Sequence, residues 1–192
     1  MLSHREHRRF SVDEYLSLEE SASVRSEFCN GEIFSMSGGS LEHNRLVRNL
    51  LGELYIALKG KKCEVLPSDI RLHMPEHQVF TYPDLLVVCG QPRLLKTRRD
   101  TVTDATLIVE VLSPSTQDYD RTEKFRIYRS LPSFQEYLLV SQEGIRLEQH
   151  SRQAPGQWLM TEHTVPDSDI DLTSIEVRIS LRSVYAGVLD LP

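Results

Sequence analysis

The fold is decided by the stretch LIVEVL at residues 107–112, which places one acidic residue, Glu110, among five apolar ones. A run this apolar is typical of a strand that is buried on both faces of a sheet. A bare carboxylate at such a position costs several kcal/mol or stays protonated. The sequence therefore indicates that a cation or a strong hydrogen-bond network meets the side chain of Glu110.

A second acidic residue, Asp84, lies near the start of another apolar run, PDLLVV at residues 83–88. If the two strands are neighbours, their carboxylates converge on one point, and we predict that Asp84 and Glu110 share a divalent metal ion. Carboxylate oxygens suit Mg²⁺ or Mn²⁺, which keep several waters and take phosphate oxygens as further ligands. Such an ion polarises a phosphate and activates a water, so the pair predicts phosphodiester hydrolysis.

The length of 192 residues suits one well-buried core and is short for two, so we expect a single domain over residues 1–192. The 22 Lys and Arg against 28 Asp and Glu give a formal net charge of -6. That balance disfavours nonspecific nucleic-acid binding by the whole surface but leaves a local basic cleft open. No apolar stretch approaches the roughly 18 residues of a membrane span, so we expect no membrane partner.

The three cysteines, Cys29, Cys63 and Cys89, form no Cys-x-x-Cys motif. An odd number of cysteines without that spacing is typical of a reducing compartment, and it argues against a disulfide framework and a cysteine zinc site. We therefore expect a cytoplasmic protein.

Helix and strand patterns alternate along the chain. Apolar periodicity and capping residues predict helices over residues 11–16, 46–58, 118–131 and 181–189. The Asn-Gly pair at residues 30–31 predicts a hairpin over residues 28–34. Apolar or alternating runs predict strands over residues 63–66, 69–72, 79–89, 107–112, 135–140, 145–150 and 158–160. The succession predicts an α/β fold with a central mixed β-sheet flanked by helices.

The helix expected after Glu110 supplies a cation. Asp120, Lys124 and Tyr128 follow one another at four-residue intervals, so they share one face of that helix. Lys124 is the candidate for orienting the attacking water or for neutralising charge in the transition state. The simpler alternative is an ordinary surface ion pair between Asp120 and Lys124, worth a few tenths of a kcal/mol.

These residues resemble the motifs of a known family. The matching segments are YPD at residues 82–84, IVEVLSPST at residues 108–116, Asp120 with Lys124 and Tyr128, and QEY at residues 135–137. From about Tyr15 to Val140 the chain is similar to a large bacterial family of putative restriction endonucleases, formerly a domain of unknown function, within the PD-(D/E)XK nuclease superfamily. The resemblance implies a restriction-endonuclease-like fold, a homodimer, and Asp84 and Glu110 as metal ligands.

One position departs from the superfamily pattern. The superfamily's lysine normally lies two residues after the second acidic residue, and Leu112 occupies that position in this chain. Lys124 would have to supply the amine from the following helix instead. The family also tends to carry an acidic residue before the first hairpin turn and a histidine at the start of the long helix. Glu27 and His43 occupy those two places.

Each candidate also has an interpretation without chemistry. A structural arginine, Arg71 or Arg126, can hold Glu110. Asp84 follows a proline and can cap a turn. Glu27 can be a solvated hairpin residue, and His43 an ordinary residue at a helix N-terminus. A separate basic cluster fits a phosphate-tracking loop and a solvated loop equally well; it contains Arg93, Lys96, Arg98 and Arg99.

The sequence thus favours a Mg²⁺- or Mn²⁺-dependent endonuclease that hydrolyses phosphodiester bonds in DNA. The catalytic candidates are Asp84, Glu110 and Lys124, and the supporting candidates are Glu27, His43, Asp120 and Tyr128. An alternative from another class is a catalytically silent nuclease-fold protein that binds nucleic acid or a protein partner. A third possibility is a metal-dependent hydrolase of small phosphorylated substrates, which shares the ligands but needs a closed pocket.

Overall fold

A six-stranded mixed sheet forms the centre of the fold in the computed structural model, which describes residues 8–96 and 98–189. Its strands lie in the order β11-β10-β9-β8-β6-β3; β8 runs parallel to β9, and the other neighbours are antiparallel. In chain order the strands are β3 (Cys63–Pro67), β6 (Leu85–Cys89), β8 (Leu107–Leu112), β9 (Glu136–Ser141), β10 (Leu147–Ala154) and β11 (Gln157–His163). The two strands expected to carry the acidic pair, β6 and β8, are neighbours.

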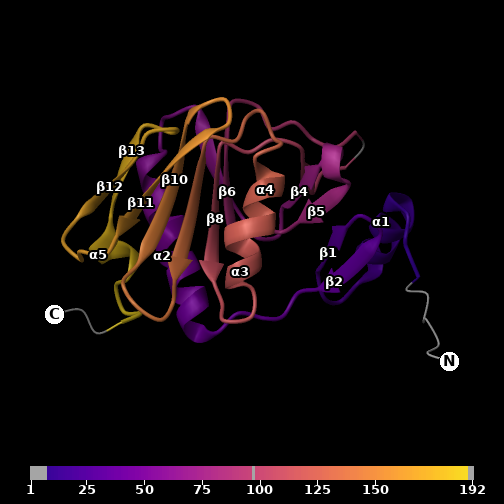
Figure 1. Cartoon of the computed structure of the whole chain (residues 1–192), viewed down its shortest axis with the longest axis horizontal. Helices are drawn as coiled ribbons and strands as arrows, with labels where there is room; N and C mark the ends of the chain where they lie inside the picture. The colour runs from indigo at the N-terminus through magenta and orange to yellow at the C-terminus, as the bar shows by residue number, and fades with distance from the viewer. Residues whose placement is uncertain (1–7, 97, 190–192) are drawn as a thin grey trace.

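A second sheet contains five shorter strands in the order β2-β1-β5-β4-β7 and lies on the right in Figure 1. The strands are β1 (Ser26–Cys29), β2 (Glu32–Ser35), β4 (Arg71–Met74), β5 (Val79–Thr81) and β7 (Thr101–Val102). The predicted hairpin is confirmed as the β1–β2 pair. It turns at Asn30 and Gly31, whose φ angles of 46° and 95° are the left-handed values that a primed turn requires.

Helices cover both faces of the central sheet (Figure 1). One face carries α2 (Leu41–Ala57), and the other carries a continuous helical segment made of α3 (Gln117–Tyr119), η2 (Asp120–Lys124) and α4 (Phe125–Tyr128). In η2 the helix widens to a π turn. The other helices are α1 (Val12–Ser21), η1 (Pro75–His77) and α5 (Leu181–Val184). Across residues 8–96 and 98–189, every helix is too short or too polar to cross a bilayer.

Two helix starts follow from local capping chemistry. Ser11 Oγ accepts a hydrogen bond from the Glu14 amide over 3.2 Å, and Glu14 accepts one from the Ser11 amide over 2.8 Å, which confirms the predicted capping box. Ser40 caps α2 by accepting a hydrogen bond from the His43 amide over 3.0 Å. Because of this cap, α2 begins one turn earlier than the leucine periodicity predicts, and His43 lies in its first turn.

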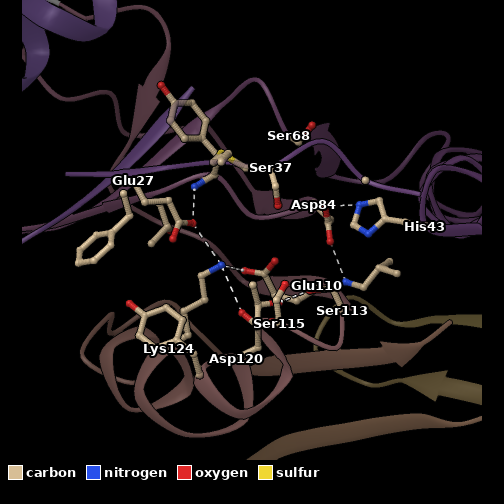
Figure 2. A pocket seen from close by; sticks show the side chains of 18 of the residues that line it. Glu27, Ser37, His43, Ser68, Asp84, Glu110, Ser113, Ser115, Asp120 and Lys124 are labelled. Atoms are coloured by element: carbon tan, nitrogen blue, oxygen red, sulfur yellow. Dashed lines mark hydrogen bonds and ion pairs between the residues drawn. The ribbon is translucent and has the colours of Figure 1, made fainter. Parts of the chain in front are cut away.

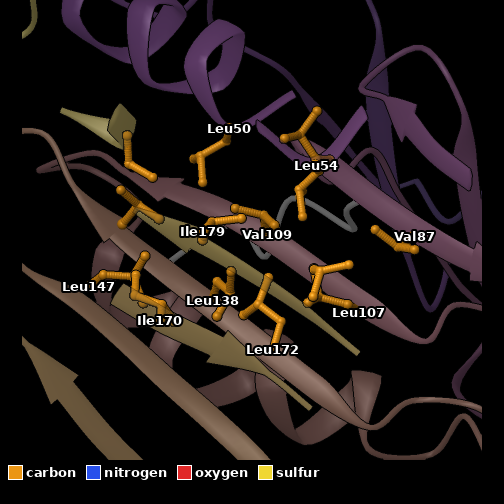
Figure 3. Packing of buried hydrophobic residues seen from close by; sticks show 14 of the residues in the cluster. Leu50, Leu54, Val87, Leu107, Val109, Leu138, Leu147, Ile170, Leu172 and Ile179 are labelled. Carbon is orange, nitrogen blue, oxygen red and sulfur yellow. The ribbon is translucent and has the colours of Figure 1, made fainter. Parts of the chain in front are cut away.

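Alternate residues of β8 face two different hydrophobic cores. Val109 and the other odd-numbered residues pack with α2 and a C-terminal hairpin, formed by β12 (Asp169–Leu172) and β13 (Val177–Ser180) (Figure 3). The even-numbered residues Ile108 and Leu112 belong to the core under α4. Glu110 shares their direction, because side chains alternate along a strand. It therefore points toward the helical segment that carries Lys124.

The strand predicted over residues 79–89 is wrong, because the structure has two strands there in different sheets. β5 ends at Thr81 in the second sheet, and β6 begins at Leu85 in the central sheet. Pro83 lies between them, and proline has no backbone N–H with which to continue an inner strand. The break places Asp84 at the head of β6, where the chain crosses from one sheet to the other.

The C-terminal part also differs from the prediction. The helix expected over residues 181–189 ends at Val184 and is followed by turns, one of which has Gly187 at a φ of 67°. The β12–β13 hairpin was not predicted. Its first strand is polar at alternate positions, and the two aspartates that point outward, Asp169 and Asp171, masked the apolar alternation of Ile170 and Leu172.

Cys63 and Cys89 form a disulfide bond, so the expectation of unpaired cysteines was wrong for this pair. The two residues are 26 positions apart but lie opposite each other on the antiparallel strands β3 and β6. Strand register brings distant residues together, and sequence spacing alone does not reveal it. Cys29 is a free thiol.

Candidate active site

Asp84, the residue just before β6, lies across from Glu110 of the neighbouring strand β8. Leu85 pairs with Val109 in the antiparallel β6–β8 register, so the next position outward places Asp84 across from Glu110. The Val111 amide donates a hydrogen bond to Asp84 Oδ2 over 2.7 Å, which joins the two strands at this point. Both carboxylates line the same pocket, as Figure 2 shows.

Lys124 provides the positive charge beside the buried carboxylate of Glu110. Its Nζ lies 3.0 Å from Glu110 Oε1, 3.2 Å from Glu27 Oε1 and 3.4 Å from Asp120 Oδ1 (Figure 2). The Lys124 side chain is only 9% exposed and that of Glu110 only 6%. An ordinary surface ion pair between Asp120 and Lys124 is therefore excluded, because the pair is buried and shares its ammonium with two further carboxylates.

The second partner of Glu110 is Tyr128, whose hydroxyl lies 2.8 Å from Glu110 Oε1. Lys124 and Tyr128 thus both contact Oε1, while Oε2 accepts no hydrogen bond from the described residues. The two arginines considered as partners lie elsewhere: Arg71 donates to the Tyr82 hydroxyl over 2.8 Å, and Arg126 pairs with Glu123. Lys124 and Tyr128, which were expected to share one face of the helix, therefore both contact Glu110.

Burial and charge set the protonation of this cluster. Burial raises the pKa of Glu110 above its ordinary value; Lys124 opposes this shift, and the nearby carboxylates add to it. Burial also disfavours the charged form of Lys124, but the carboxylates around it outweigh that effect and hold its pKa well above the ordinary value. Lys124 is therefore an ammonium group at neutral pH, which donates hydrogen bonds and cannot accept a proton.

His43 contacts Asp84 from the first turn of α2. Its Nε2 lies 3.0 Å from Asp84 Oδ1, and this hydrogen bond raises the pKa of His43 more than burial lowers it. Gly39 makes room for the imidazole, since a Cβ atom at that position would lie 2.5 Å from His43 Cδ2. Together with the Val111 amide, the histidine fixes both oxygens of Asp84.

A pocket of 740 Å³ contains this cluster. Of the seven residues predicted from the sequence, all line it except Tyr128, which is fully buried beneath Glu110. Gln142 also lines the pocket and was not predicted; it accepts a hydrogen bond from Ser40 over 2.7 Å and donates one to the Leu112 carbonyl over 2.6 Å. It lies just after β9, in a segment whose sequence carries no motif that would have identified it.

The chemistry of the donors fits a cation of the Mg²⁺ type. Such ions take one or two protein carboxylates and complete their shell with water and substrate phosphates. Asp84 and Glu110 meet that requirement, with Glu110 Oε2 uncommitted. Within residues 8–96 and 98–189, no group of three or more His, Cys, Asp or Glu side chains could hold a metal. The residues therefore suit an ion that depends on water and substrate for its remaining ligands.

The sequence matches one protein family over most of its length. The model of the Uma2 family, described as "Putative restriction endonuclease", matches residues 12–182. The chain belongs to this family. The resemblance seen in the motifs is thereby confirmed and extends beyond Val140.

Two uncharacterized proteins of Synechocystis sp. (strain ATCC 27184 / PCC 6803 / Kazusa) are similar to this Uma2 chain. One, sll1609, is 37% identical over 164 residues, and the other, slr1290, is 35% identical over 180 residues. The alignments cover 85% and 94% of this chain and 93% of each relative.

A solved structure shows the same fold. It is the crystal structure of a putative nuclease belonging to DUF820 from Anabaena variabilis ATCC 29413, and it matches this Uma2 chain with a TM-score of 0.77. The match covers 94% of this chain and 99% of the other, at 15% identity. The predicted restriction-endonuclease-like α/β fold is therefore confirmed. Families with this fold generally use divalent metals.

Proposed function

We propose that this Uma2 protein is a Mg²⁺- or Mn²⁺-dependent endonuclease that hydrolyses phosphodiester bonds in DNA. The observation that carries the proposal is the buried ammonium of Lys124, 3.0 Å from Glu110, in a pocket that Asp84 also lines. Membership of a family of putative restriction endonucleases supports a nuclease, and the pocket suggests which residues perform the reaction.

Asp84 and Glu110 would hold the metal ion. When bound, Mg²⁺ or Mn²⁺ supplies positive charge to the phosphate oxygens and lowers the pKa of a bound water. His43 and the Val111 amide orient Asp84 through its two oxygens. Tyr128 holds Glu110 through Oε1, which leaves Oε2 free to bind. Partners of this kind commonly set the direction of metal ligands.

Lys124 would act as an electrostatic group. Because its pKa is raised, it stays charged, orients the attacking water and neutralises charge on the phosphate in the transition state. Glu27 and Asp120 hold its ammonium in place. Leu112, at the position where the superfamily carries its lysine, is buried. The contacts of Lys124 support the idea that the amine reaches the site from the neighbouring helix.

A plasmid-nicking assay tests the proposal. Purified protein is incubated with supercoiled DNA and Mn²⁺, with and without a chelator, and nicked product is measured over time. Wild-type protein should nick the plasmid only without chelator. Asp84→Ala and Glu110→Ala should each lower the rate at least about 100-fold, the scale on which loss of one electrostatic group acts.

A matched control for these variants is Asp171→Ala, because Asp171 is exposed and pairs with Arg178 far from the pocket. It should nick at the wild-type rate, and circular dichroism should show that all three variants are folded. Unchanged nicking by both Asp84→Ala and Glu110→Ala would refute the proposed site.

A second candidate is a catalytically silent protein of the same fold that binds nucleic acid or a protein partner. The charges in the pocket favour its protein-binding form over its nucleic-acid-binding form. Four carboxylates line the pocket beside one lysine and one histidine, and this balance disfavours a polyanion. Binding of DNA without metal-dependent nicking under any of the conditions above would support this candidate over the enzyme.

We also propose that the chain forms one domain and assembles as a homodimer, which suits cleavage of both strands by two sites. Light scattering in solution would measure the mass of the assembly directly. The cytoplasmic location stays a prediction, and the Cys63–Cys89 bond is the feature that counts against it, because disulfides are rare in a reducing cytosol.

A further inference from the structure

A second hollow, of 290 Å³, is basic where the catalytic pocket is acidic. Three arginines, Arg126, Arg129 and Arg152, line it together with His77 and Trp158, and no aspartate or glutamate among the described residues does. Arg126 belongs to α4, and Arg129 follows the last residue of that helix. Arg152 and Trp158 are register partners across β10 and β11. Segments distant in the sequence thus bring cationic side chains to one place.

Two of the arginines are positioned without any acidic partner. Arg152 Nη1 donates to the Pro132 carbonyl over 3.3 Å, and the guanidinium of Arg129 lies 4.9 Å from the centre of the Phe125 ring. Neither arginine forms an ion pair with a described carboxylate. A guanidinium held by a carbonyl or a ring is oriented but keeps its whole charge for a ligand.

The basic loop singled out in the sequence shows the opposite arrangement. Arg98 pairs with Asp100 over 2.9 Å and with Glu20 over 2.7 Å, and Arg93 lies 3.4 Å from Asp104. Carboxylates of the protein already neutralise these two cations, so this loop is a weaker candidate for binding an anion than the hollow.

We propose that the hollow binds a backbone phosphate of the nucleic acid. The planar fork of an arginine matches two phosphate oxygens, and Arg129 and Arg152 offer two such forks at one site. Arg126 is the third cation, although it shares its charge with Glu123. Phosphate contacts of this type fix the position of a nucleic acid and supply salt-dependent affinity.

The place of the hollow relative to the catalytic pocket supports this assignment, which rests on the proposed nuclease function. Lys124 lines the catalytic pocket, whereas Arg126 and Arg129 line the hollow, so different sides of one helical segment face the two sites. A nucleic acid that contacts both sites passes around a helix about 10–12 Å wide. Because carboxylates dominate the catalytic pocket, the affinity for the polyanion has to come from cations outside it.

Binding in the absence of cleavage tests the proposal. Fluorescence anisotropy of a labelled short DNA duplex is measured in chelator, for wild type and for the double variant Arg129→Gln/Arg152→Gln. The double variant should bind about tenfold or more weakly, and the slope of log K against log salt should fall by about two, one for each phosphate contact. Arg48→Gln is the control, since Arg48 is exposed on α2, hydrogen-bonds Asn49 and does not line the hollow.

Several results would overturn the proposal. Equal affinity and an equal salt slope for wild type and double variant would show that the hollow binds no DNA phosphate, whatever the nicking assay gives. Absence of any duplex binding by the wild type would also overturn the proposal.

A second experiment titrates inorganic phosphate into the wild type and the double variant by calorimetry. Phosphate binding that the double variant loses, with duplex binding unchanged, would assign the hollow to free phosphate and reject the nucleic-acid assignment. Weaker duplex binding by the double variant supports the hollow even if no nicking is found.

Discussion

The two faces of strand β8 differ by a single step along the chain. Val109 points into the largely apolar core under α2, to which Leu50, Leu138 and Ile179 belong. Glu110, the next residue, points the other way and meets an ammonium, a phenol hydroxyl and further carboxylates. The same strand thus serves as core on one side and as the floor of the candidate site on the other.

This difference separates the sources of stability from the sources of chemistry. The α2 face gains stability mainly from removing apolar area from water, and its buried carboxylate, Glu136, is held by Gln149 and Ser174 outside the candidate pocket. The α4 face buries charge, which costs free energy unless the charges match one another. Variants on the two faces should therefore behave differently in unfolding and in cleavage, and four predictions use that contrast, from the largest expected effect to the smallest.

Loss of the Lys124 charge should have the largest effect. Lys124→Met leaves the carboxylates of Glu27, Glu110 and Asp120 together without a cation, and it should lower the free energy of unfolding by about 4 kcal/mol. Urea titration measures the change. Lys59→Met, at an exposed position in the turn after α2, is the control and should change little. Equal stability of the two variants would show that the ammonium does not balance the buried charges.

A cavity in the apolar core under α2 should lower the free energy of unfolding somewhat less than Lys124→Met does, and it should leave the cleavage rate unchanged. Leu50 is fully buried in α2, and Leu50→Ala should lower the free energy of unfolding by about 3 kcal/mol. Nicking per folded molecule should remain at the wild-type level when measured well below the melting temperature. Leu41→Ala, at an exposed position on the same helix, should change stability by less than about 0.5 kcal/mol. A selective loss of nicking in Leu50→Ala would contradict the division between the faces.

Binding of Mn²⁺ should stabilise the folded protein through the candidate site on the polar side of β8. At a hundredfold excess over its Kd, Mn²⁺ should add about 2.7 kcal/mol to the free energy of unfolding of the wild type. Calorimetry should show no such gain for Asp84→Asn, whereas Asp171→Asn should respond as the wild type does. An equal shift in all three proteins would place the ion somewhere other than the candidate site.

The smallest effect is expected for Glu110→Gln. The amide can still accept the hydrogen bond of Tyr128 and is neutral like the protonated carboxyl group, so stability near pH 4.5 should change by less than about 1 kcal/mol. Nicking should nevertheless be lost, because an amide is a poor ligand for Mg²⁺ or Mn²⁺.

The same variant has a pH signature. The folded pKa of Glu110 is raised above its ordinary value of 4.5, so the folded state holds its proton more tightly than the unfolded state does. Wild-type stability should therefore fall, relative to Glu110→Gln, as the pH rises from that ordinary value to the raised one. A stability difference that does not change with pH over this interval would show that Glu110 is charged in the folded protein throughout.

Sequence patterns were sufficient for the fold class and for most of the residues that now lie together. Glu110 was recognisable because a carboxylate inside an apolar strand needs a partner, and Lys124 because its spacing from Asp120 and Tyr128 fixed a helix face. Both arguments depend on periodicity within a single element, which a sequence displays directly. The roles of these residues in catalysis stay predictions.

Features that depend on how elements meet were not accessible in the same way. The Cys63–Cys89 bond depends on strand register. The arginine hollow combines a helix end with two strands and a turn, none of which carries a motif. The break at Pro83 was visible in the sequence, yet the apolar residues on both sides outweighed the proline and produced one strand in the prediction.

The crossing at Pro83 has a consequence for how the candidate site responds to strain. Glu27 belongs to the small sheet, whereas Glu110 belongs to the large one, and Asp84 lies at the joint between them. Lys124 spans that joint by contacting both glutamates. Any movement of one sheet against the other would therefore change the distances between the carboxylates of the cluster. The two ion pairs of Lys124 oppose such a movement, because they join the sheets across the joint.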